Sequence, residues 1–163
     1  MTLKRAALVI ISIASLSLLA CATQNKSRGY RLASASPTDD IQSFVVTLYT
    51  SGDNKDEGNG VKVSIVRNGE VVASRGFVDE SLTYPPGDVR DWPIKRLQPF
   101  IVSDASKSKL LVTMSGNSGN WEAKFSVLGI KDDGTAIVFL PQSAQVHFES
   151  GETNTREFQM KMP

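Results

Sequence analysis

One loop of the sequence concentrates side chains that suit a calcium ion. Residues 51–60 read SGDNKDEGNG and lie between two segments in which apolar and polar residues alternate. Ca²⁺ binds about six to eight oxygen ligands, which a glycine-rich loop with carboxylate and amide side chains can supply. The spacing departs from an EF-hand, because Lys55 occupies the third position and Ser64 the twelfth. A solvated turn rich in Asp, Asn and Gly is the alternative interpretation.

The other reactive residues do not form a recognisable catalytic set. The one histidine, His147, falls on the polar phase of an alternating segment, so we expect it to face solvent. Zinc sites of the common kind need several His or Cys ligands, and the sequence has a single cysteine, Cys21. We therefore expect a protein without catalytic residues. A glycan hydrolase that uses two of the 17 acidic residues stays open as an alternative.

The two tryptophans have different predicted roles. Trp121 begins an alternating segment on its apolar phase, which predicts a core position. Trp92 lies within residues 84–99, which contain four prolines and are predicted to form a long ordered loop. An aromatic side chain on such a loop is expected to be partly exposed, as a binding anchor or as a cap on the end of the domain.

The first twenty residues have the features of an export signal. Lys4 and Arg5 precede an apolar run from Ala6 to Ala20, which is too short to span a bilayer as a helix. The run ends at the only cysteine, in the sequence Leu-Leu-Ala-Cys at positions 18–21. An ordinary secretory signal or an uncleaved anchor would have the same charge and hydropathy pattern.

Leu18, Ala20 and Cys21 resemble the lipobox of bacterial lipoproteins. The resemblance implies that residues 1–20 are a cleaved signal peptide and that Cys21 carries diacylglycerol and an acylated amine. Two or three acyl chains hold a protein stably on a membrane, so the lipid bilayer is an expected partner. Ala22 after the cysteine implies, within that family, transfer to the outer membrane, on its periplasmic or surface face.

Charge and composition limit the partners further. Without Lys4 and Arg5, 16 basic residues face 17 acidic residues, so the exported part is nearly neutral. Nucleic acid is therefore not an expected partner, because it requires a clustered basic surface. Residues 22–40 are small and polar without any period, so residues 21–41 are predicted to be the lipidated cysteine and a flexible tether.

Residues 42–163 have the pattern of an antiparallel β-sandwich. Five or more segments alternate apolar and polar residues, as in a strand with one buried and one solvated face. Asn68-Gly69 and Asp133-Gly134 each separate two such segments, which predicts two tight hairpins. About seven to nine short strands at this spacing favour a single all-β sandwich domain, with a barrel as the second choice.

Parts of this domain are similar to PLAT-type β-sandwiches. Residues 46–53 read as a strand that enters a Gly-Asp loop, and residues 110–130 read as a strand, a loop, a tryptophan and a strand. The resemblance implies eight strands, with loops at one end that contact lipid or protein, sometimes through Ca²⁺. It would bring together at that end Asp53, Asp56, Asn117 and Asn120.

The functional expectation combines the anchor and the fold. It is a membrane-anchored lipoprotein whose β-sandwich binds another envelope protein or a glycan, or serves a structural role, without a cofactor. A Ca²⁺-dependent lipid or glycan module of the PLAT type is the first alternative, and the carboxylate-pair glycan hydrolase is the second.

Overall fold

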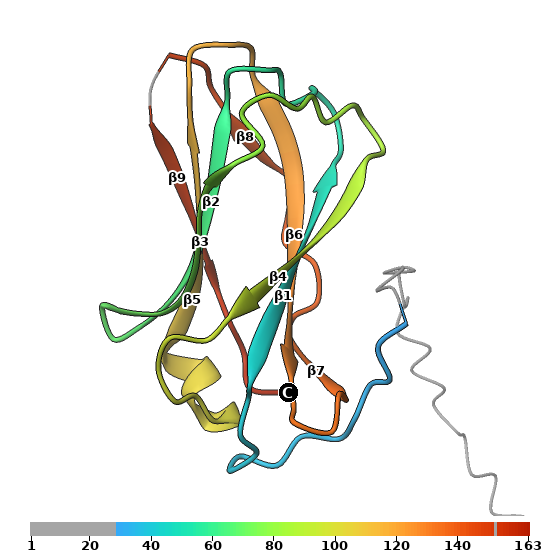
Figure 1. Ribbon diagram of the computed structural model, residues 1–163, viewed down its shortest axis with the longest axis vertical. Coiled ribbons are helices and arrows are strands. Elements are labelled where there is room, and N and C mark those ends of the chain that lie inside the picture. Colours follow the sequence, from blue (N-terminus) through green and yellow to red (C-terminus); the bar gives the residue numbers. More distant parts are fainter. Residues whose placement is uncertain (1–28, 152) are drawn as a thin grey trace, which may run out of the picture.

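Two antiparallel β-sheets pack face to face (Figure 1). The computed structural model describes residues 29–151 and 153–163. Its elements are β1 (Ser43–Thr50), β2 (Gly60–Arg67), β3 (Glu70–Val78), β4 (Val89–Lys95), the 3₁₀ helix η1 (Val102–Lys107), β5 (Ser108–Ser115), β6 (Trp121–Ile130), β7 (Ala136–Leu140), β8 (Val146–Phe148) and β9 (Asn154–Gln159). The predicted all-β sandwich is therefore confirmed.

The strand order explains which residues become neighbours. The first sheet has the order β4-β1-β6-β7, and β8 pairs with the first residues of β6, on the same side as β7. The second sheet has the order β3-β2-β5-β9. The core between the sheets holds the inward-facing residues of both, with Trp121 fully buried against Phe125 and Phe148. Trp121 is thus in the core, as its position on the apolar phase predicts.

The proline-rich stretch contains a strand that the sequence pattern does not predict. Residues 89–95 form β4, which pairs with β1 and places Pro93 opposite Val45. Proline is tolerated there because β4 is at the edge of its sheet, so no second ladder needs the missing N–H. The expected exposure of Trp92 is wrong, because this side chain is only 3% exposed.

The segment before β1 is attached to the sandwich, which corrects the predicted extent of the flexible tether. Ala33 donates its amide to the carbonyl of Ala136, and Ala136 donates its amide to the carbonyl of Arg31. Ile41 is fully buried. The domain therefore begins about twelve residues before the predicted start at residue 42. The predicted signal peptide, Cys21 and the rest of the tether lie outside the described residues.

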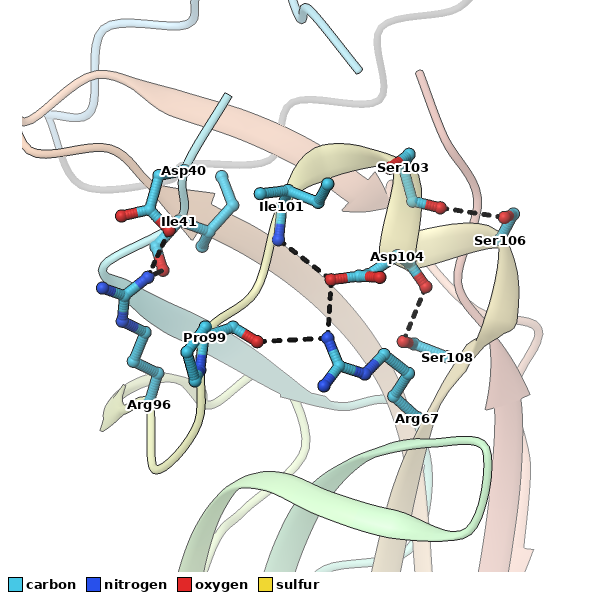
Figure 2. Close-up of polar contacts among 10 residues, drawn as sticks. All are labelled: Asp40, Ile41, Arg67, Arg96, Pro99, Ile101, Ser103, Asp104, Ser106 and Ser108. Carbon is cyan, nitrogen blue, oxygen red and sulfur yellow. Dashed lines mark hydrogen bonds and ion pairs between the residues drawn. The ribbon is translucent and has the colours of Figure 1, made fainter. Parts of the chain in front are cut away.

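Figure 2 shows the polar contacts of two arginines at the end of the sandwich where the segment before β1 enters. Arg96, just beyond β4, pairs with the carboxylate of Asp40 and donates to the carbonyl of Ile41 at 2.7 Å. Arg67, at the end of β2, pairs with Asp104 of η1 at 2.7 Å. Asp104 also accepts the amide of Ile101 at 3.0 Å, so its carboxylate joins the strand, the 3₁₀ helix and the chain before it.

Within residues 29–151 and 153–163, no helix has the length and apolar character needed to cross a bilayer.

Candidate functional site

Four connections meet at the end of the sandwich opposite η1 (the upper end in Figure 1). They comprise residues 51–59, 79–88, 116–120 and, within the part of the chain that the structure describes, 149–151 and 153. The first and third are tied together by Asn59, a fully buried side chain whose Oδ1 accepts the amide of Ser118 at 3.2 Å and whose Nδ2 donates to the carbonyl of Ser118. Loops that are far apart in sequence therefore converge at this end.

The four predicted calcium ligands share no common set of contacts. Asp56 accepts a hydrogen bond from Asn54 and lies so close to Gly119 that a Cβ at that glycine would overlap its carboxylate. Asn120 instead accepts the amide of Ser150 at 3.1 Å. Asn117 is exposed, and the carboxylate of Asp53 lies with a different group of side chains. The four predicted calcium ligands therefore take part in separate interactions rather than in one common set.

Asp53 belongs to a cluster with Glu122 and His147. Glu122 of β6 lies directly opposite His147 of β8 in the strand register. On its other side, the amide of Glu122 donates to the carbonyl of Asp53 at 3.1 Å. The three side chains hold possible ligand atoms that all lie within 4.8 Å of one another. Glu122 and His147 were not among the predicted site residues, because only the β6–β8 register brings them together.

A buried lysine holds two of the converging loops in place. Lys55 is fully buried, and its ammonium donates to the carbonyls of Leu82 at 2.6 Å, Asp79 at 2.8 Å and Asp56 at 3.2 Å. The same ammonium lies 4.7 Å from the ring centroid of Tyr84. Burial lowers the pKa of Lys55 below its ordinary value. In sequence, Lys55 occupies a position at which the EF-hand pattern needs an oxygen ligand. In the structure, its hydrogen bonds connect residues 51–59 to residues 79–88.

A concave surface lies beside Lys55, between β3, β4 and their connection. It is a pocket of about 490 Å³, within the size range of small-molecule sites. Apart from Val89 and Trp92, its lining is charged. The lining residues are Arg75, Asp79, Asp88, Val89, Arg90, Asp91 and Trp92.

Aromatic rings support both arginines of the pocket. The guanidinium of Arg75 lies 4.8 Å from the ring centroid of Trp92, and that of Arg90 lies 4.1 Å from the ring centroid of Tyr84. Both aromatic side chains are almost completely buried, so the rings act as platforms beneath the cations. The role of Trp92 is therefore to position Arg75, while its own ring is hardly accessible to a ligand.

Protein donors fix the three carboxylates of the pocket. Asp88 pairs with Arg90 at 2.7 Å, and Asp91 accepts the hydroxyl of Thr47 at 2.7 Å. Asp79 accepts the hydroxyl of Tyr84. Burial, followed by this hydrogen bond to Asp79, raises the pKa of Tyr84, so its hydroxyl stays protonated and remains a donor at neutral pH. The pocket therefore presents charged groups whose orientations are set before any ligand arrives.

Comparison with known proteins does not add a family to this geometry. No protein-family model and no curated protein sequence matches the chain.

Proposed function

We propose that this protein is a lipid-anchored, non-catalytic binding module of the bacterial cell envelope, and that its pocket takes a hydroxyl-rich glycan. The observation that carries the proposal is the pocket between β3 and β4, in which two arginines and three aspartates are held in fixed positions. The Ca²⁺-dependent alternative lacks comparable support, because the four predicted ligands do not share contacts.

The mixture of donors and acceptors favours a neutral polar ligand. Carboxylates only accept hydrogen bonds and guanidinium groups only donate them, whereas each sugar hydroxyl does both. A purely anionic ligand would be repelled by Asp79, Asp88 and Asp91. A purely cationic ligand would be repelled by Arg75 and Arg90. A chain of hydroxyl groups can satisfy both kinds of residue at once, as specific recognition of a polar ligand requires.

The same contacts favour binding over hydrolysis. Glycoside hydrolysis needs one carboxylic acid that holds a proton and presents it to the leaving oxygen. Within the described pocket, each aspartate already accepts a hydrogen bond or an ion pair from a protein donor: Asp79 from Tyr84, Asp88 from Arg90 and Asp91 from Thr47. Each carboxylate is therefore already held in place by a protein partner, which suits a residue that binds and orients a ligand.

Removal of one pocket charge should weaken glycan binding strongly. We expect Arg75→Ala and Asp91→Asn each to reduce affinity for a bound envelope glycan by at least tenfold, because each leaves a polar group of the ligand unpaired. The measurement is a binding titration of the purified chain against soluble fragments of envelope polysaccharides. Lys109→Ala, which deletes an exposed cation on β5, is the matched control and should bind normally. If the parent chain binds none of the fragments, or all four proteins bind equally, the pocket does not perform this function.

The anchor half of the proposal depends on Cys21. If the lipobox resemblance describes this chain, the product isolated from membranes lacks residues 1–20 and carries acyl mass at Cys21. We expect Cys21→Ser to retain the leader, since the cysteine is the modification site on which cleavage depends. Intact-protein mass spectrometry distinguishes these products. An unmodified amino terminus, or a leader still present on the parent chain, would remove the membrane anchor from the account.

A further inference from the structure

We propose that Asp53, Glu122 and His147 form a binding site for Zn²⁺ or a similar divalent first-row metal ion. This site goes beyond the proposed function, because it shares no residue with the pocket between β3 and β4. Glu122 lies in the middle, with Asp53 on one side and His147 on the other. Because Trp121 points into the core, its neighbour Glu122 points to the opposite, outer face of the first sheet.

The backbone fixes the relative positions of the three side chains. Trp121, Glu122 and Ala123 pair with Phe148, His147 and Val146 in an antiparallel ladder. On the other side of β6, Ser51 donates its amide to the carbonyl of Glu122 at 2.8 Å, and the amide of Glu122 donates to the carbonyl of Asp53 at 3.1 Å. His147 lies directly across the ladder from Glu122, and the possible ligand atoms of Asp53, Glu122 and His147 all lie within 4.8 Å of one another.

The separation of the central pair is compatible with two ligands of one metal ion. The Nδ1 atom of His147 lies 3.6 Å from Oε1 of Glu122, beyond the usual hydrogen-bond distance. Two ligands of one tetrahedral Zn²⁺, at about 2.0–2.2 Å from the metal, are separated by roughly this distance. The other oxygen of Glu122, Oε2, accepts the side-chain amide of Gln145 at 2.7 Å, which orients the carboxylate as an outer-shell partner does.

Charge supplies an independent reason for a cation. Asp53, in the connection after β1, and Glu122 of β6 place two carboxylates close together, an arrangement that is destabilising when nothing neutralises it. Across residues 29–151 and 153–163, neither carboxylate forms an ion pair with a lysine or an arginine. A divalent ion bound between them would remove this repulsion.

Gly52 makes room for the central ligand. A Cβ atom at this position would overlap the carboxylate of Glu122, so a larger residue would displace it. The combination of one imidazole nitrogen with carboxylate oxygens favours Zn²⁺ over Ca²⁺. Zn²⁺ accepts nitrogen ligands, whereas Ca²⁺ usually binds about six to eight oxygens. Three protein ligands leave a fourth position for water, as in an open zinc site.

The test is a titration of the untagged full chain in detergent with ZnSO₄, followed by calorimetry, and with CoCl₂, followed by visible absorption. We expect one Zn²⁺ per chain and the strong visible bands of tetrahedral Co²⁺. Glu122→Gln and His147→Ala should each weaken Zn²⁺ binding by at least tenfold, and Gln145→Ala by about tenfold, through the loss of an orienting partner. An equal concentration of CaCl₂ should not compete.

Two controls make the outcome decisive. Asp132→Asn changes an exposed acid in the turn between β6 and β7, and it should bind Zn²⁺ as the parent does. Cys21→Ser removes the only thiol and should also bind normally. The proposal is overturned if the parent does not bind Zn²⁺, if Glu122→Gln and His147→Ala bind it normally, or if Cys21→Ser abolishes binding. Circular dichroism of each variant shows whether the sandwich remains folded.

Discussion

Replacement of Lys55 by methionine should lower the free energy of unfolding by about 3 kcal/mol. Methionine matches the length of lysine but removes the ammonium that donates to the carbonyls of Asp56, Asp79 and Leu82. A buried acceptor left without a donor costs about 1–3 kcal/mol, and here three acceptors lose the same donor. Part of this loss is offset because the unfolded chain no longer has to desolvate a charge on folding. Urea unfolding at equilibrium measures the difference.

The control for Lys55 is Lys62, which is exposed on β2. Lys62→Met should change the free energy of unfolding by less than about 0.5 kcal/mol, as exposed substitutions away from special features usually do. Equal unfolding midpoints for the Lys55 and Lys62 variants would show that the ammonium does not hold residues 51–59 to residues 79–88. In that case the shape of the adjacent pocket would need another explanation.

Replacement of Gly129 by alanine should destabilise the fold by about 2–3 kcal/mol. Gly129 lies in β6, where a Cβ would overlap the ring of Phe139 and come within 3.1 Å of the side chain of Ile41. Both neighbours are fully buried or nearly so, and they cannot move without disturbing the core. Overpacking of this kind typically costs about 1–3 kcal/mol. Thermal unfolding followed by circular dichroism records the change.

Gly76 is the matched control, because it is also a strand glycine but has open space around its Cα. No heavy atom lies within 4 Å of a Cβ built there, apart from its own chain neighbours. Gly76→Ala should therefore be neutral or stabilising by up to about 1 kcal/mol, since alanine reduces the freedom of the unfolded chain. A Gly129→Ala variant as stable as Gly76→Ala would contradict the described packing of β6 against Phe139.

Local chemistry was sufficient to predict most of the strands. Asn68 and Gly69 both have positive φ, of 51° and 89°, as the predicted tight hairpin between β2 and β3 requires. Alternation also placed Trp121 in the core and His147 on the outer, partly exposed side. These properties depend on residues close together in sequence, which is why a single sequence reveals them.

Features decided by sheet position were predicted poorly. Proline normally argues against a strand, but β4 accepts Pro93 because it is an edge strand, and an edge is defined only by the complete topology. The same reason accounts for Trp92, whose burial follows from membership in β4. Residues 29–41 lack any period, yet their backbone bonds to Ala136 and Phe100 attach them to the sandwich.

The candidate sites depend on contacts between distant residues, so sequence spacing could not reveal them. Asp53, Glu122 and His147 are separated by long stretches of chain and meet through the β6–β8 register and the backbone hydrogen bond from Glu122 to Asp53. Lys55 appeared only as a residue that spoils a calcium-binding pattern, because nothing local shows that three carbonyls surround it. The pocket arises where β3 and β4, which belong to different sheets, approach each other.

The most direct test of the central claim is an amide NMR titration of the ¹⁵N-labelled chain with a soluble envelope glycan. If the pocket is the binding site, shifts concentrate at Arg75, Asp79 and residues 88–92, which line it, and Arg75→Ala loses them. The hairpin at residues 68–69, at the other end of β3, should not respond. Shifts confined to residues outside the pocket, or no saturable shift with any glycan, would contradict the account.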